Sequence, residues 1–109
     1  MKHILVITAL AAACAPALAA DLAKGKQLAD TQCAACHGPE GNKPIDPSYP
    51  RLAGQYADYL AKVLVDYQKG LRKNAIMGGI AKPLTRADIE NVSAYYASVP
   101  GVLGDRKAK

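Results

Sequence analysis

Two cysteines and a histidine stand together in the segment Cys33-Ala34-Ala35-Cys36-His37. Thiolates and imidazole nitrogens are the side-chain groups that exchange disulfides, bind metals and anchor cofactors. A Cys-x-x-Cys spacing occurs in redox disulfides, in half of a zinc site, in structural disulfides and in the covalent attachment of haem. The correct interpretation must also explain the histidine that directly follows the second cysteine.

The rest of the sequence favours haem attachment over the other three interpretations of this spacing. A redox pair of this kind belongs next to a βαβ unit, and no segment has the alternation of a strand. A zinc site needs four ligands, and downstream of residue 20 the chain has only two cysteines and one histidine. A disulfide across this spacing closes a very small loop and leaves His37 without a role. C-x-x-C-H is the attachment motif of c-type haem. In this interpretation Cys33 and Cys36 form thioethers with the haem and His37 binds its iron. The remaining alternative is a chance occurrence of the motif.

Met77 is the expected second axial ligand of the iron. Downstream of residue 20 it is the only methionine and His37 the only histidine, so two histidines of this chain cannot share one iron. Met77 precedes two glycines in a segment that we expect to be an irregular loop, where glycine lets backbones approach closely. A lone methionine also serves as core filler. Lys73, Lys82 or an open position remain alternatives for the second ligand.

Residues 1–19 have the pattern of a secretory signal peptide. Lys2 precedes an apolar run over residues 4–13, and Ala17-Leu18-Ala19 forms a small-x-small cleavage site. Cleavage after Ala19 predicts an exported protein and removes Cys14. A lipid on Cys14 is the alternative, although the position three residues before it is not the leucine that such sites favour. No later apolar run is long enough to cross a membrane.

Composition predicts a small domain that needs additional support for its core. The 109 residues include six tyrosines but no tryptophan and no phenylalanine. A mature chain of about 90 residues has a marginal core unless a disulfide, a metal or a cofactor supports it. The formal net charge of +5 is too small to indicate nucleic acid binding. It fits a protein that meets acidic patches on its partners.

The helical pattern predicts an all-α domain over residues 20–104, with no strand. We expect three main helices, near residues 21–34, 55–69 and 85–99. The last begins at a capping box, in which Thr85 is the N-cap and Asp88 the third helical residue. Gly25 costs about 1 kcal/mol relative to alanine inside the first helix, which indicates that another element approaches it closely. Prolines exclude a helix between Gly38 and Pro50, and we expect the ending GDRKAK, with a tail at 105–109, to be disordered.

The chain resembles the class I cytochromes c, especially small bacterial periplasmic members and one half of the tandem dihaem cytochromes. The similar segments are Gly25, CAACHG, YPRLAGQ, the Met77 region and TRADIENVSAYYAS. The resemblance implies three main helices wrapped around one covalently bound haem c. It also implies that Gly25 meets Tyr95 where the first and last helices cross.

The same resemblance assigns roles to three further residues. It implies that the carbonyl of Pro50 accepts a hydrogen bond from the second nitrogen of His37, which fixes the ring orientation. It implies that Arg51 and Tyr59 contact the haem propionates or the haem edge. As alternatives, Pro50 only ends the loop, Arg51 is an ordinary surface arginine, and Tyr59 is a packed tyrosine without a haem contact.

The function that the resemblance implies is a periplasmic electron carrier, not an enzyme. A dedicated haem subunit of a periplasmic dehydrogenase is the first alternative, and a haem enzyme or gas binder with an open distal site is the second. The expected partners are redox proteins with acidic patches, and a homodimer stays open. Docking would use basic residues near the second helix and the Met77 segment, unless these are only scattered solvated charges: Lys62, Lys69, Arg72, Lys73, Lys82 and Arg86.

Overall fold

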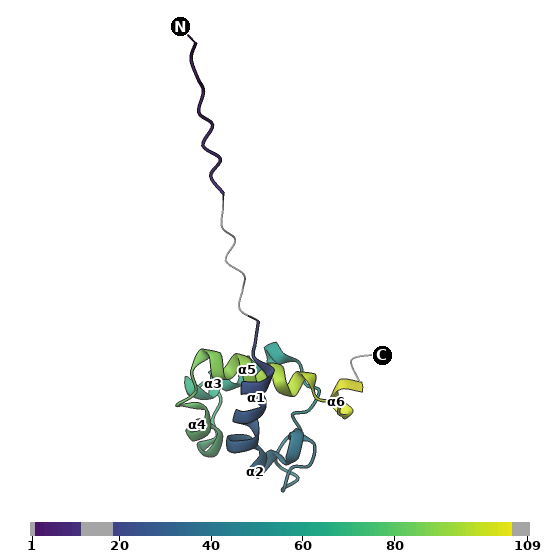
Figure 1. Ribbon diagram of the computed structural model, residues 1–109. Helices are drawn as coiled ribbons and strands as arrows, with labels where there is room; N and C mark the ends of the chain where they lie inside the picture. Colours follow the sequence, from purple (N-terminus) through teal and green to yellow (C-terminus); the bar gives the residue numbers. More distant parts are fainter. Residues whose placement is uncertain (1, 12–18, 106–109) are drawn as a thin grey trace.

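The computed structural model describes residues 2–11 and 19–105, and within these ranges it is helical, without any strand. Figure 1 shows the helices gathered into one body, in which α1 crosses α5. The elements in chain order are α1 (Leu22–Leu28), a π-helix (Ala29–Cys33), α2 (Ala34–His37), a 3-10 turn (Pro39–Gly41), α3 (Ala57–Gln68), α4 (Ala75–Ala81), α5 (Arg86–Ser98) and α6 (Val102–Asp105). The all-α prediction is confirmed: the first expected helix corresponds to α1 and the π-helix, and α2 continues it to His37.

The expected signal peptide is only partly within the described residues. Residues 2–11 form no helix or strand, and their side chains are exposed. Cys14 and the cleavage-site residues Ala17 and Leu18 lie outside the described residues. No helix in residues 2–11 and 19–105 has the length and apolar character needed to cross a membrane.

Gly25 explains how α1 and α5 can cross so closely. A Cβ atom at Gly25 would lie 2.1 Å from the carbonyl oxygen of Asn91 and 2.9 Å from the Cβ of Tyr95. Both distances are shorter than non-bonded contacts allow, so only glycine fits here. The amide of Asp21 also donates to Asn91 Oδ1 over 2.8 Å, which fixes the start of α1 against α5. The predicted contact between Gly25 and Tyr95 is confirmed.

The start of α5 follows directly from its local sequence. Thr85 Oγ1 accepts a hydrogen bond from the amide of Asp88 over 3.1 Å, and Asp88 Oδ2 accepts one from the amide of Thr85 over 2.9 Å. These reciprocal bonds satisfy backbone donors that a helix start leaves unpaired. The predicted capping box is therefore confirmed.

A small apolar core joins α1, α3 and α5. Its buried members come, in chain order, from the π-helix, the segment before α3, α3 itself, and α5 with the residue that follows it. They are Ala29, Ala53, Leu60, Val92, Tyr95, Tyr96 and Val99. The amide of Gly54 donates to the carbonyl of Tyr96 over 2.8 Å, and the amide of Leu52 donates to the carbonyl of Gly41 over 2.9 Å. The first bond ties this part of the chain to α5, and the second brings the two ends of the proline-rich segment together.

Two predictions about irregular segments were wrong in detail. The segment from Gly38 to Pro50 contains a single 3-10 turn that starts at Pro39, where a helix start tolerates proline because no amide donor is needed. Gly104 and Asp105, expected to be disordered, are helical in α6. A Cβ at Gly54 would lie 2.5 Å from the amide nitrogen of Gly104, so the close packing of α6 on Gly54 accounts for this order. Residues 106–109 lie outside the described residues.

Candidate haem-binding site

Cys33 and Cys36 both line one cavity. Cys33 ends the π-helix and Cys36 belongs to α2. A π-helical turn inserts extra backbone into a helix and frequently occurs at functional sites. Both thiols are free and half-buried, and burial raises the pKa of the Cys33 thiol. Two thiols at one cavity wall are suited to form two thioether bonds with a single cofactor.

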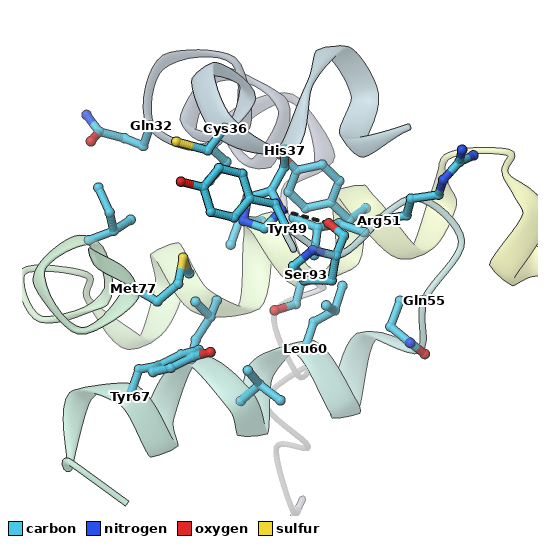
Figure 2. A pocket seen from close by; sticks show the side chains of 18 of the residues that line it. Gln32, Cys36, His37, Tyr49, Arg51, Gln55, Leu60, Tyr67, Met77 and Ser93 are labelled. Atoms are coloured by element: carbon cyan, nitrogen blue, oxygen red, sulfur yellow. Dashed lines mark hydrogen bonds between the residues drawn. The ribbon is translucent and has the colours of Figure 1, made fainter. Parts of the chain in front are cut away.

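His37 is buried and held in one orientation. Its side chain is 6% exposed, and its Nδ1 lies 2.8 Å from the carbonyl oxygen of Pro50. A carbonyl can only accept, so Nδ1 is the donor in this bond, and in the neutral imidazole Nε2 then has the lone pair that can bind a metal. The hydrogen bond that the resemblance implies between His37 and Pro50 is thus present, and Figure 2 shows it as a dashed line.

Gly38 turns the chain away immediately after His37. Its φ is +81°, a left-handed conformation that side chains other than glycine rarely adopt, and a Cβ there would lie 1.9 Å from the carbonyl oxygen of Lys43. The amide of Ile45 then donates to the carbonyl of Cys36 over 3.0 Å. This return of the chain onto α2 leads to Pro50, whose carbonyl contacts His37.

One cavity collects every site residue that the sequence predicted. Its volume is about 950 Å³, at the upper end of the range of roughly 300–1,000 Å³ for small-molecule and cofactor sites. The predicted residues that line it are Cys33, Cys36, His37, Pro50, Arg51, Tyr59 and Met77. Arg51 and Tyr59 are exposed to solvent, and Tyr59 retains 48% of its accessible surface. These two side chains therefore lie at the mouth of the cavity.

Met77 lies on a helix, which corrects the prediction of an irregular loop. It is the third residue of α4, and the side chain of Asn74 caps this helix by accepting from the amides of Ile76 and Met77 over 3.1 and 3.0 Å. Apart from chain neighbours and the adjacent backbone of α4 itself, no atom of the described residues lies within 4 Å of a Cβ placed on Gly78 or Gly79. These glycines therefore do not serve the close backbone approach that we expected. Figure 2 shows the Met77 sulfur directed into the cavity that His37 also enters.

Neither lysine considered as an alternative ligand lines the cavity. Lys73 and Lys82 are exposed, and they flank α4 on the outside of the site. Met77 is half-buried and does line it. The geometry thus favours the methionine over either lysine.

Sequence reasoning missed two further residues of the cavity wall. The sequence pattern places Tyr67 only in the apolar stripe of the second helix, and Arg72 only in the basic cluster. In the structure Arg72 Nε donates to Tyr67 Oη over 3.1 Å, and its guanidinium lies 5.5 Å from the centre of the tyrosine ring. The hydrogen bond to Tyr67 raises the pKa of Arg72. Helical spacing could not reveal this pair, because the helix ends between the two residues.

The cavity fits a haem in its shape and its donor set. Much of its wall is apolar, as a porphyrin plane requires, and this part includes Leu28, Leu60, Val63, Leu64, Ile80, Leu84 and Val92. Ser93 also lines it; this residue is 2% exposed and its hydroxyl has no hydrogen-bond partner among the described residues. A polar group of a bound cofactor can satisfy this hydroxyl. An imidazole, a thioether and two thiols on one apolar cavity match the ligand chemistry of c-type haem.

Comparisons with known proteins point to the same family. A family model described as cytochrome c matches residues 22–100. The chain is 42% identical over 80 residues to cytochrome c4 of Thiocapsa roseopersicina, an alignment that covers 73% of this chain and 41% of that protein. It is 37% identical over 99 residues to the thiosulfate dehydrogenase electron acceptor of Thiomonas intermedia, covering 91% of this chain and 45% of that protein. The chain thus spans less than half the length of these two relatives.

A shorter relative is matched over almost its whole length. The chain is 41% identical over 83 residues to cytochrome c-554(548) of Halomonas halodenitrificans, covering 73% of this chain and 98% of that protein. Among solved structures, reduced cytochrome c4 from Pseudomonas stutzeri matches with a TM-score of 0.65 and 33% identity, over 75% of this chain and 51% of that chain. Thiosulfate dehydrogenase (TsdBA) from Marichromatium purpuratum matches with a TM-score of 0.68 and 32% identity. This match covers 73% of this chain and 19% of that chain.

Proposed function

Since the chain belongs to the cytochrome c family, whose members bind haem c covalently, we propose that it is a periplasmic electron carrier with one haem. The observation that carries the proposal is the convergence of His37 from α2 and Met77 from α4 on one cavity beside two thiols. A bound haem c supplies an iron atom that accepts and releases one electron. Cys33 and Cys36 would anchor it, and His37 and Met77 would be the axial ligands.

The side chains of this chain would orient a bound haem and supply both of its axial ligands. The hydrogen bond from His37 to Pro50 fixes the orientation of the imidazole plane. Methionine as the second axial ligand raises the reduction potential relative to a second histidine. His37 and Met77 would together fill both axial positions and leave none open for a substrate or a gas. This arrangement suits electron transfer rather than catalysis.

The mouth of the cavity is the proposed route of the electron. Arg51 and Tyr59 are exposed there, where they would contact the haem propionates or the haem edge. Of the six basic residues expected to guide docking, three are engaged with neighbouring side chains: Lys62 with Asp66, Arg72 with Tyr67 and Arg86 with Glu90. The other three, Lys69, Lys73 and Lys82, are exposed and free of ion pairs within residues 19–105. They are the best candidates to attract an acidic redox partner.

A haem subunit of a dehydrogenase is the second candidate function. It is favoured by the similarity to a protein named thiosulfate dehydrogenase electron acceptor and to part of the TsdBA structure. Purification of the tagged protein from its native cells distinguishes the two. A dehydrogenase recovered in constant stoichiometry supports the subunit, whereas recovery as an isolated cytochrome supports the free carrier.

The ligand assignment is tested with variants of Met77 and of the two lysines. Met77→Ala should abolish the far-red ferric absorption band of methionine ligation and allow carbon monoxide to bind the ferrous protein, because one axial position opens. Lys73→Ala and Lys82→Ala are the controls and should leave both properties unchanged. A Met77→Ala protein with an unaltered spectrum would assign the axial position to another group.

Export is tested on the mature protein. The proposal expects an N-terminus at Ala20 and a mass that includes one covalent haem. A lipid on Cys14 would contradict cleavage after Ala19.

A further inference from the structure

The helix that carries Met77 is too short and too rich in glycine to be stable alone. It contains seven residues, and Gly78 and Gly79 occupy its interior. Glycine is among the least favourable residues inside a helix, and isolated helices shorter than about 12 residues are marginal in water even without glycine. The position of Met77 therefore depends on what holds the two ends of α4.

The side chain of Asn74 holds the first end and that of Gln68 holds the second. Gln68 is the last residue of α3, and its Nε2 donates to the carbonyl of Ala81 over 2.8 Å and to the carbonyl of Leu84 over 2.7 Å. Ala81 ends α4, and the amide of Leu84 donates back to its carbonyl over 3.1 Å. One half-buried amide thus uses both of its hydrogens to bridge the turn that leaves α4.

We propose that Gln68 is a positioning residue for Met77, which it holds at the iron by tying the C-terminal end of α4 to α3. The inference rests on the proposed function, because it assumes that Met77 is an axial ligand. Groups that hydrogen-bond behind a ligand set its orientation and tune the metal. Here the bond runs through the backbone of α4, so its loss lets the helix and the sulfur move away together.

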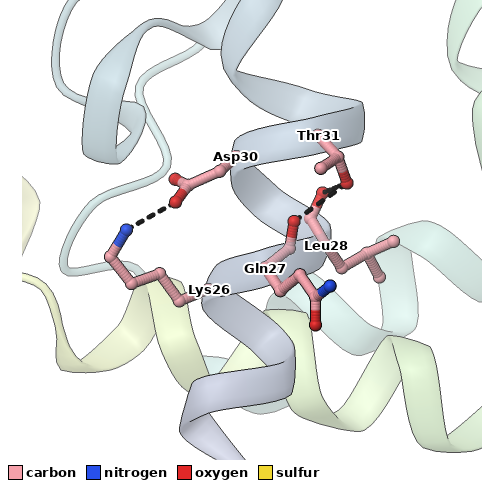
Figure 3. A network of polar contacts seen from close by, with 5 residues as sticks. All are labelled: Lys26, Gln27, Leu28, Asp30 and Thr31. Atoms are coloured by element: carbon pink, nitrogen blue, oxygen red, sulfur yellow. Dashed lines mark hydrogen bonds and ion pairs between the residues drawn. The ribbon is translucent and has the colours of Figure 1, made fainter.

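Gln68→Leu tests this role, since leucine keeps most of the volume and removes both donors. Gln68→Asn is the milder variant, because it keeps the amide but shortens its reach by one methylene. Gln27 on α1 provides a matched control. Its exposed side chain makes no hydrogen bond within the described part of the chain, and Figure 3 shows that only its backbone carbonyl is engaged, with Thr31. Gln27→Leu therefore makes the same chemical change at an exposed position that does not line the cavity.

The three measurements report on the second axial ligand and not on folding alone. They are the far-red ferric band, carbon monoxide binding to the ferrous protein, and the reduction potential, each measured on the haem-loaded full chain. In Gln68→Leu we expect a weaker band, a lower potential and carbon monoxide binding enhanced about tenfold, the scale of losing two neutral hydrogen bonds. Gln68→Asn should change all three in the same direction by less, and Gln27→Leu should match the wild type.

A double variant separates positioning from general stability. In a Met77→Ala background, Gln68→Leu should no longer alter carbon monoxide binding, because no sulfur remains to be positioned. An effect that persists at full size there, or wild-type spectra in both Gln68 variants, would overturn the inference. If Met77→Ala itself leaves the spectrum unchanged, the ligand assignment fails and the inference falls with it. If Met77→Ala changes the spectrum but the Gln68 variants do not, the positioning role of Gln68 is contradicted while the ligand assignment stands.

Discussion

Gly25→Ala tests whether the crossing of α1 and α5 limits the stability of this protein. The added Cβ would lie 2.1 Å from the carbonyl oxygen of Asn91 and 2.9 Å from the Cβ of Tyr95. Two of the three nearest atoms are the backbone carbonyl of α5, so rotation of a side chain cannot relieve the clash. Either the two helices move apart, or the substituted chain cannot adopt this packing.

The expected magnitude is a difference between two opposing effects. Alanine in place of glycine inside a helix contributes about 1 kcal/mol of stability. Relief of the clash requires the helices to shift by about 1 Å, and overpacking of this kind costs about 1–3 kcal/mol and occasionally more. Because the obstacle is backbone, we expect the upper end of that range, and hence a net loss of about 2 kcal/mol. For a domain of this size, that corresponds to a melting temperature lower by roughly 10 °C.

Thermal and denaturant unfolding of the haem-loaded protein measures this loss, with Gly79→Ala as the matched control. Gly79 is in the interior of α4, and apart from its chain neighbours and the adjacent backbone of α4 itself, no described atom lies within 4 Å of a Cβ placed on it. The same substitution there should raise the free energy of unfolding by about 0.5–1 kcal/mol, since only the helix propensity changes. Equal stabilisation by both substitutions would refute the close crossing.

Three further changes test other parts of the molecule. Thr85→Ala removes the N-cap of α5 and should lower the free energy of unfolding by about 1 kcal/mol in a denaturant titration; an unchanged midpoint would show that the cap is dispensable. Replacing Lys69, Lys73 and Lys82 together with glutamine should slow electron transfer to an acidic partner at low salt and flatten its salt dependence, and an unchanged rate in stopped-flow measurements would exclude these lysines from docking. The Cys33→Ala/Cys36→Ala double variant should release its haem on acid–acetone extraction, whereas haem that stays bound would contradict the thioether assignment.

The parts of the site that the sequence alone determined are those made within a few residues. The spacing of Cys33, Cys36 and His37 specifies haem attachment because one short helical segment presents all three to the same cofactor. The capping box at Thr85 and Asp88 forms because its hydrogen bonds join residues three positions apart. The glycine at position 25 indicated a close contact, although the identity of its neighbour came from the family resemblance.

Only the tertiary structure decided how Met77 reaches the site. Its two following glycines favour an irregular loop by local propensity, yet α4 forms because Asn74 caps one end and Gln68 holds the other. The carbonyl that Gln68 binds on Leu84 lies 16 positions along the chain, and no periodicity in the sequence encodes such a contact. The proposed second axial ligand can be chosen from composition, but the position of Met77 depends on packing between α3 and α4, which exists only once the chain has folded.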